Sequence, residues 1–517
     1  MGTRTWNKDR AAKRIDDKIA ALPLKDIEIK EYVRETELGN IPNNTAYRVD
    51  GVHLYADILN VGDMLRVTDV EGETCHRRTL RFLNLHYRAV HRLLNRVEAV
   101  KVDFHNQRLH TVIAKPYDSE TERVHRAVAI AQLIIDVLAQ TGEDADHPAA
   151  KIRVGIDTGK ALAVNNGRRG HREPLFLGDP ANHAAKRASG GAATGIYLTN
   201  RARKAIGLQA VDSEDAVALT TQEVVISKDK ARLDIKADQI VKDWQQDLKD
   251  NPIGAFKFSG HTPPFRDLDF ESLSVGNSRR QDASSVYADI DGFTAFVSRN
   301  IATDDNAKQV VRTLQVLRSE LDAVLHEDFA GRKVRFIGDC VHGLAAEGTA
   351  QTTDPEETIS VMSLCAAGMR SSFDLARSKL KISGTDVSSL GLSIGFEYGP
   401  MTATRLGVKG DLIRCSVSRG VITAEREQQR CGGTETAIGS AAYSAGNEAI
   451  RTVFGKARKR AQLDYPTLVD ELAAKNDKTA RAIKAEQVSL LKPATAAAGS
   501  FTFPDRKTAP SKPDGFA

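Results

Sequence analysis

Two aspartates, Asp289 and Asp339, each lie where a short apolar segment ends. Such segments are typical of buried β-strands, and Gly292 and Gly338 beside the two acids predict tight turns at which a ligand can approach the backbone. Magnesium in phosphate chemistry is usually held by one or two carboxylates together with phosphate oxygens. If the two strands are neighbours, the pair can therefore hold divalent metal ions beside a phosphorylated substrate. A helix beginning directly after Gly292 would also point its N–H groups at that phosphate.

The segment that carries Asp289 has a counterpart in the first half of the chain, because Tyr-Ala-Asp-Ile occurs both at 55–58 and at 287–290. The pattern after each copy continues in the same order, and His110 and His342 hold matching places. The paired segments are a helix (77–99 and 308–326), two strands (100–114 and 333–345), a second helix (121–140 and 357–380), and a strand ending in a glycine-flanked turn (155–159 and 395–399). We therefore predict a duplicated α+β domain with the order β-α-β-β-α-β-α, since chance similarity would not preserve this order.

Changes in composition along the chain suggest where the two domains begin and end. A charged helical arm precedes the first copy, a connection with Pro and Gly punctuation separates the copies, and an Ala-, Pro- and Lys-rich tail is predicted to be disordered. The boundaries that we predict are 1–42 for the arm, 43–243 for the first domain, 244–283 for the linker, 284–490 for the second domain and 491–517 for the tail.

The overall composition narrows the possible partners and cellular location. The chain has 517 residues with 73 Lys and Arg against 68 Asp and Glu, and a net charge of +5 is too small to predict a nucleic-acid partner. No apolar run reaches the ~18 residues that cross a bilayer. Five scattered cysteines without a CxxC pair predict neither a disulfide framework nor a structural zinc site. We expect a cytoplasmic protein that contacts neither membrane nor nucleic acid.

The motifs ADIDGFT and FIGD, about fifty residues apart, resemble those of the class III nucleotidyl cyclases, and the resemblance covers about 46–207 and 284–448. It implies two tandem ferredoxin-like βαββαβ domains that form a head-to-tail pseudo-dimer within one chain. Two divalent ions, Mg²⁺ or Mn²⁺, would be bound by Asp289, the Ile290 carbonyl and Asp339. Backbone N–H groups of Gly292, Phe293 and Thr294 would hold the substrate phosphates.

In this family one domain of the pair carries the metal-binding acids. The other domain supplies an Asn that orients the ribose and a cation that stabilises the transition state, in the pattern VNxAxR. The first copy here has Ala181-Asn182-His-Ala-Ala-Lys186-Arg187. Asn182 fits the pattern, but its arginine position holds Lys186, with Arg187 next to it. The resemblance therefore implies catalytic roles for Asn182 and for Lys186 or Arg187, with Lys186 preferred by spacing.

The two copies are complementary, because each lacks what the other has. The first keeps Asp57 but has Gln107 where the second has Asp339, and we place Arg414 of the second copy opposite Asn182. One complete and one degenerate site are expected, with a structural role for Asp57. An alternative alignment would put Asp103, four residues before Gln107, opposite Asp339.

The base-recognition positions of the family correspond by spacing to Asp103 and Leu175, which match neither the adenine nor the guanine pattern. The segment LFLGDPANHAAK (175–186) resembles the pyrimidine cyclases of the bacterial Pycsar anti-phage systems. This resemblance implies a lyase that converts UTP to cyclic UMP, a second messenger read by a separate effector protein. A cytidylate cyclase, an adenylate cyclase and a non-catalytic nucleotide-binding module are the alternatives.

Other polar residues have simpler interpretations. Asp291 is expected to be a turn or helix-cap acid rather than a metal ligand, and His110 and His342 are expected to be core or interface histidines, because no second His stands at zinc spacing. A polymerase-like palm fits the motifs poorly. The sequence leaves open the activating signal and whether chains also form homodimers.

Overall fold

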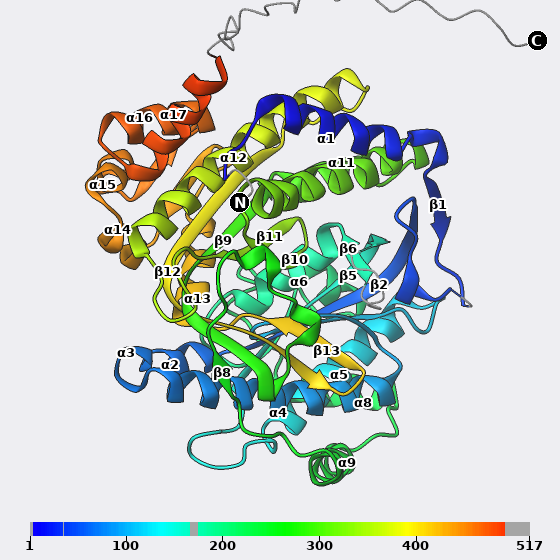
Figure 1. Cartoon of the computed structure of the whole chain (residues 1–517). Coiled ribbons are helices and arrows are strands. Elements are labelled where there is room, and N and C mark those ends of the chain that lie inside the picture. The colour runs from blue at the N-terminus through cyan, green and yellow to red at the C-terminus, as the bar shows by residue number, and fades with distance from the viewer. Residues whose placement is uncertain (1–3, 35, 166–173, 492–517) are drawn as a thin grey trace, which may run out of the picture.

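The chain folds into two similar α+β units that face each other, preceded by an N-terminal arm (Figure 1). The computed structural model describes residues 4–34, 36–165 and 174–491. The arm contributes α1 (Lys8–Ala21) and β1 (Glu28–Glu31). The first unit contains, in chain order, β2 (Thr45–Ile58), α2 (Val61–Leu65), α3 (Thr68–Glu71), α4 (Glu73–Val97), β3 (Val100–His105), β4 (Arg108–Ile113), α5 (Glu120–Leu138), β5 (Ile152–Asn165), β6 (Pro174–Leu177), α6 (Asp179–Ser189), β7 (Gly195–Leu198) and α7 (Asn200–Ala205).

The second unit repeats this order after two connecting helices. The connection and the second unit contain α8 (Thr221–Ala231), α9 (Ala237–Asp250), β8 (Phe258–Ser259), β9 (Ser278–Asp291), α10 (Phe293–Asn300), α11 (Asp304–Ala323), β10 (Arg332–Ile337), β11 (Cys340–Ala345), α12 (Pro355–Ile382), β12 (Gly391–Val408), β13 (Asp411–Cys415), α13 (Arg419–Gln429), β14 (Glu435–Ile438), α14 (Ser440–Ala445), α15 (Glu448–Phe454), β15 (Lys459–Ala461), α16 (Tyr465–Ala474) and α17 (Lys478–Leu491).

Each unit has one mixed sheet whose topology matches that of the other. The first sheet has the order β3-β4-β2-β5-β6, with β1 added to β2 and β7 to β5. The second has the order β10-β11-β9-β12-β14-β15, with β13 added to β12 and β8 to β9. The central pair is antiparallel in both, and Tyr55 pairs with Gly155 as Tyr287 pairs with Gly395. The predicted duplicated α+β domain is therefore confirmed.

A glycine in each central strand lets a helix lie directly on the sheet. A Cβ atom on Gly155 would stand 2.1 Å from the Ala184 carbonyl oxygen of α6, and one on Gly395 would stand 2.0 Å from the Gln428 nitrogen of α13. No side chain can occupy such a space. These glycines therefore fix α6 and α13 on their sheets, and α6 carries the candidate ribose-binding residue Asn182.

Each unit contributes residues to the hydrophobic core of the other. The core of the second unit includes Ala46, Leu162 and Leu177 from the first, and the core of the first unit includes Leu406 and Ile413 from the second. The contacts are reciprocal, since α6 touches α10 of the other unit and α13 touches α2. This exchange gives the predicted head-to-tail arrangement, and it buries apolar surface that neither unit would cover alone.

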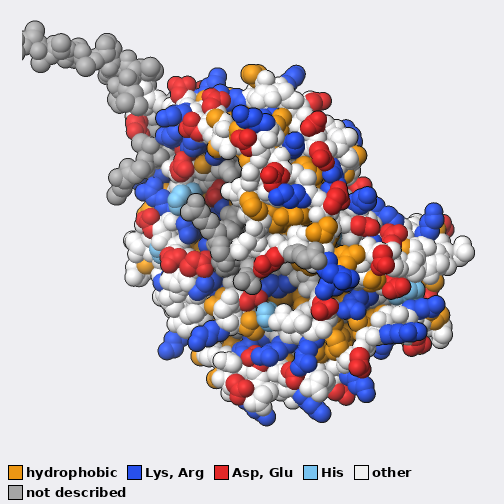
Figure 2. Space-filling view, turned by 90° about the vertical axis from the view of Figure 1, so that its right-hand side faces the viewer, with side chains coloured by type: hydrophobic (Ala, Val, Ile, Leu, Met, Phe, Trp, Pro, Cys, Tyr) orange, Lys and Arg blue, Asp and Glu red, His pale blue; other side chains and the backbone are white. Residues whose placement is uncertain are grey.

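The structure also shows how the predicted boundaries fall. Helix α9 runs across 243/244 and β9 begins at Ser278, so the predicted linker 244–283 contains the end of a helix and the start of a strand. Nearly all of the predicted tail lies outside the described residues. No helix in the described ranges is long and apolar enough to span a bilayer. On the face in Figure 2, acidic and basic side chains are interspersed, in keeping with the small net charge.

Candidate active site

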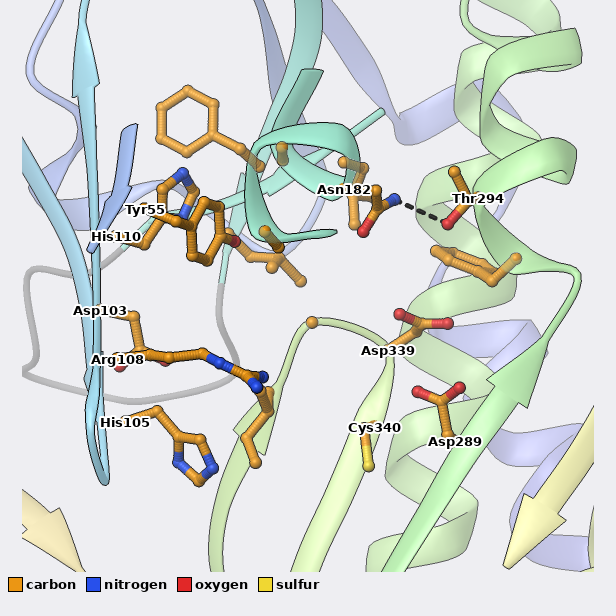
Figure 3. A pocket seen from close by; sticks show the side chains of 18 of the residues that line it. Tyr55, Asp103, His105, Arg108, His110, Asn182, Asp289, Thr294, Asp339 and Cys340 are labelled. Carbon is orange, nitrogen blue, oxygen red and sulfur yellow. Dashed lines mark hydrogen bonds between the residues drawn. The ribbon is translucent and has the colours of Figure 1, made fainter. Parts of the chain in front are cut away.

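A cavity of about 390 Å³ lies between the two units, and side chains of both units line it (Figure 3). The first unit contributes residues of β3, β4, β6 and α6, and the second contributes β9, α10, α13 and the β10–β11 turn. Asn182 and Lys186 from the first unit line the same cavity as Asp289 and Asp339 from the second. The cavity thus joins residues from distant parts of the sequence, as expected for a composite site.

Asp289 and Asp339 point toward each other at one side of the cavity (Figure 3). Asp289 is near the end of β9, and Asp339 is in the turn between β10 and β11, where Gly338 has a φ of 60°. Burial and the nearby Asp291 raise the pKa of Asp289 to about 6. Burial and the Asp289 carboxylate raise the pKa of Asp339 well above its usual value. A divalent cation would relieve this repulsion, so the pair fits a metal site.

The described residues hold no cluster of three His, Cys, Asp or Glu side chains arranged to hold a metal ion. Two carboxylates without a third protein acid suit Mg²⁺ or Mn²⁺, because water and substrate phosphates complete the coordination of such ions. Ile290 lies between Asp289 and Asp291 in β9. Its side chain is in the core, so only its carbonyl is available to a metal. Asp291 is exposed and lies at another hollow, away from this cavity.

The phosphate-binding candidates stand at the start of α10. Gly292, with a φ of 77°, is its N-cap, and Phe293 and Thr294 begin the helix and line the cavity. The N–H groups of a first helical turn have no partner within the helix, and they attract anions. This end of α10 follows Asp289 by only a few residues, so the metal and phosphate positions adjoin.

One face of helix α6 contacts α10 of the second unit. The Asn182 side chain amide donates a hydrogen bond of 2.6 Å to the Thr294 hydroxyl of α10. Lys186, one turn further along, lines the cavity. The Arg187 guanidinium instead pairs with Glu214 at 2.7 Å and with Asp215 at 3.1 Å, outside the cavity. Of the two candidate cations, geometry therefore favours Lys186.

Both base-pocket candidates line the cavity at the end formed by the first unit. Leu175 is buried in β6. Asp103 forms an ion pair with Arg335 of the second unit, and the same guanidinium donates to the Phe104 carbonyl. The charge of Asp103 is therefore balanced across the interface by Arg335.

Sequence reasoning missed Arg108, whose side chain reaches into the cavity beside Asp103 (Figure 3). Its guanidinium is 3.2 Å from Glu425 of α13 and 3.7 Å from Asp57. Burial lowers the pKa of Arg108, but Asp57 and Glu425 outweigh it and raise that pKa, so the group stays charged. The only sequence signal was an arginine directly after Gln107, where the second copy has Cys340 after Asp339.

The pseudo-symmetric counterpart of this site keeps Asp57 at the position of Asp289 but has no carboxylate at the position of Asp339. Gln107 occupies the β3–β4 turn as Asp339 occupies the β10–β11 turn, so the alternative alignment of Asp103 with Asp339 is wrong. Arg108 lies beside Asp57 there. The placement of Arg414 opposite Asn182 was also wrong, because Arg414 is in β13 and pairs with Glu271.

The helices themselves give the correct correspondence. Gly155 packs on Ala184 and Ala188 of α6, while Gly395 packs on Gln428 of α13, and strand pairing aligns Leu175 with Cys415. This register places Ile422 at the position of Asn182, and an apolar side chain cannot hydrogen-bond a ribose. The degenerate site remains degenerate, for a different residue than expected.

Each of the two recurrent histidines stacks on the tyrosine of the repeated motif in its own unit. His110 stacks on Tyr55 with ring centroids 4.0 Å apart, and His342 stacks on Tyr287 at 4.4 Å. Burial lowers the pKa of each well below its usual value, so both are neutral. Their packing fits the predicted core role, although His110 also touches the cavity.

Comparison with known proteins places these features in a family. The model of the adenylate and guanylate cyclase catalytic domain matches residues 51–228 and 275–460. The chain is 56% identical over 489 residues to a uridylate cyclase of Pseudomonas aeruginosa, covering 94% of each chain. It is 38% identical over 434 residues to a uridylate cyclase of a Rhizobium species, covering 80% of this chain and 82% of that one. A crystal structure of a class III adenylyl cyclase-like ATP-binding protein from P. aeruginosa superimposes with a TM-score of 0.89 at 57% identity, covering 91% of this chain and 100% of that chain.

Proposed function

Because this chain belongs to the adenylate and guanylate cyclase catalytic domain family, we propose that it converts UTP to 3′,5′-cyclic UMP and pyrophosphate. The main support for the type of reaction is that Asp289 and Asp339 of the second unit line the same cavity as Asn182 and Lys186 of the first. The names of the two uridylate cyclase relatives support UTP as the substrate.

In this reaction the ribose 3′-oxygen forms a bond to the α-phosphorus, and the bond from that phosphorus to the β-phosphate oxygen breaks, which releases pyrophosphate. Asp289, Asp339 and the Ile290 carbonyl would hold two Mg²⁺ or Mn²⁺ ions, which when bound acidify the hydroxyl and neutralise the leaving group. The proton of the 3′-hydroxyl passes to water, and no side chain is assigned as its base.

The other residues position the nucleotide. Asn182 would exchange its hydrogen bond with Thr294 for one with the ribose, which aligns the attack. Lys186 would meet the negative charge that develops on the α-phosphate. The N–H groups of Gly292, Phe293 and Thr294 would hold the β- and γ-phosphates at the start of α10.

The biological setting that we propose is bacterial anti-phage defence, in which cyclic UMP activates a separate effector protein in the cytoplasm. The resemblance of segment 175–186 to pyrimidine cyclases supports this role. This role in defence requires no direct contact between this chain and the effector protein.

The direct test is to incubate the purified protein separately with UTP, CTP, ATP and GTP and with Mn²⁺ or Mg²⁺, and to identify products by mass spectrometry. We expect cyclic UMP to form at least about ten times faster than any other cyclic nucleotide, because sites built on base hydrogen bonds discriminate strongly. The ATP reaction is the essential comparison, since one similar structure is described as ATP-binding. A dominant cyclic CMP or cyclic AMP product would replace the substrate assignment, and no product from any nucleotide would refute the enzyme.

Arg108 is the residue that we propose reads the base. Guanidinium groups only donate hydrogen bonds, and O4 of uracil accepts one, whereas the corresponding group of cytosine is an amine donor. The Arg108 guanidinium is charged and held at the cavity by Glu425 and Asp57.

We expect Arg108→Gln to lower kcat/KM for UTP by about 10- to 100-fold, the loss of one charged hydrogen bond, while CTP turnover stays unchanged or rises, because the amide oxygen of glutamine can accept from the cytosine amine. Arg96→Gln is the matched control, because Arg96 pairs with Asp243 at the surface. An unchanged ratio of UTP to CTP turnover in Arg108→Gln would show that another group reads the base.

A further inference from the structure

The side chain of Arg48 joins three parts of the chain at the seam between the units. Arg48 lies in β2 of the first unit, and its guanidinium donates to the Ile301 carbonyl at 3.2 Å and to the Asp304 carboxylate at 2.6 Å, both in the second unit. It also approaches Glu31 of the arm at 3.5 Å. The Arg48 side chain is 15% exposed, whereas the Asp304 side chain is 60% exposed, so the guanidinium is mostly covered but its ion pair with Asp304 remains open to water on one side.

The two second-unit contacts stand at helix ends of suitable polarity. Ile301 is the C-cap of α10, and Asp304 is the first residue of α11. The C-terminal end of a helix attracts a cation, and the N-terminal end favours an acidic side chain. Arg48 therefore fills the corner between the two helices, where its fork contacts both ends at once.

The other end of α10 is also tied to the first unit. Asn182 of α6 bonds Thr294, and the Ser298 hydroxyl donates to the Asp179 carboxylate of α6. Helix α10 is thus bonded to the first unit near both of its ends, and among these contacts only the Asn182–Thr294 bond joins two residues that line the cavity.

The N-terminal arm contacts both units as well. Strand β1 pairs in parallel with β2, so that Glu31 stands beside Arg48, while α1 packs on α11 and α12 of the second unit. In that contact Arg14 bonds the buried carboxylates Glu320 and Asp328 at 2.7 and 2.8 Å. One continuous segment therefore touches both units, and its strand β1 also contacts α11.

We propose that Arg48 is a positioning residue for cyclisation, which fixes α10 and the metal-binding unit against the unit that carries Asn182 and Lys186. This inference rests on the proposed function. If the link is cut, the second unit still holds its own metal and phosphate positions, so binding of the UTP triphosphate changes little. The alignment of the 3′-oxygen with the α-phosphate depends on both units, so turnover falls.

The test compares Arg48→Gln, Asp304→Asn and Arg48→Lys with the wild type, using kcat per folded molecule and KM for UTP. We expect kcat to fall by about 10- to 100-fold in Arg48→Gln, as for small misplacements of reacting groups, with KM within about threefold. Asp304→Asn keeps the Ile301 contact and Arg48→Lys keeps the charge, so both should lose less. Arg299→Gln is the matched control, since Arg299 is in the last turn of α10 but bonds Ser389 of its own unit.

Hydrogen–deuterium exchange without nucleotide gives a readout that does not depend on activity. Amides of 293–300 should exchange faster in Arg48→Gln than in the wild type or Arg299→Gln, while other helices of the second unit keep their rates. Unchanged exchange at 293–300, or a kcat per folded molecule equal to that of the wild type, would overturn the proposal. An inactive wild type would instead contradict the proposed function, and the exchange experiment would still decide the role of Arg48.

Discussion

Asp289→Asn and Asp339→Asn should each lower cyclase turnover by about 10³-fold or more. Metal ions at a phosphoryl-transfer site supply several kcal/mol of charge stabilisation, and about 1.4 kcal/mol corresponds to a factor of ten in rate. Asparagine keeps the size of the side chain but removes the charge that holds a cation. Turnover of UTP at saturating Mn²⁺ measures this effect.

Asp291→Asn is the control for this prediction, because Asp291 lies two residues away in β9 but faces another hollow. It should keep nearly full activity. Neither active-site variant should be less stable without metal, since burial and mutual repulsion raise the pKa values of Asp289 and Asp339 and disfavour the ionised pair. Mn²⁺ should raise the melting temperature of the wild type more than that of either variant. Full turnover in Asp289→Asn or Asp339→Asn would exclude these acids as metal ligands.

Lys186→Ala should lower kcat by about 100- to 1000-fold, the usual effect of removing one donor to a developing oxyanion. The same substitution at the next residue, Arg187→Ala, should change kcat little, because Arg187 pairs with Glu214 and Asp215 outside the cavity. The measurement is steady-state kinetics with UTP for both variants, normalised to folded protein.

Lys186→Arg adds a check on this assignment, since a guanidinium keeps the charge in a bulkier group and should recover part of the rate. Arg187→Ala is expected to lower thermal stability, because it leaves Glu214 without this cation and leaves Asp215 with only the more distant Arg153 at 4.0 Å. If Arg187→Ala were the variant that lost turnover while Lys186→Ala kept it, the cation would be Arg187, and α6 would have to rotate when nucleotide binds.

The choice between Lys186 and Arg187 shows a limit of sequence reasoning. Successive residues of a helix point about 100° apart, so only one of two neighbouring cations can face a given cavity. Which one does so depends on how α6 rests on the sheet, and that contact is set by Gly155 against Ala184. The family motif gives the spacing along the chain but not this rotation.

The correspondence between the two copies was recognisable only where their residues resemble each other. The repeated Tyr-Ala-Asp-Ile and the recurrent His110 and His342 aligned the first half of each unit correctly, and Gln107 was rightly matched to Asp339. In β13 and α13 little similarity remains, and Arg414 was misplaced. Strand pairing and helix packing fixed that register, because hydrogen bonds and close contacts constrain positions that composition leaves free.

The sequence by itself determined the duplicated α+β architecture and the two acids Asp289 and Asp339, because strand periodicity, glycine turns and acidic motifs are local patterns. Only the tertiary structure brought Arg108 to Glu425, Asp103 to Arg335 and Arg48 to Asp304. Each of these pairs joins residues far apart in the chain, one from each unit, and such contacts arise from the packing of one unit on the other. No local pattern records which charged side chains that packing will bring together.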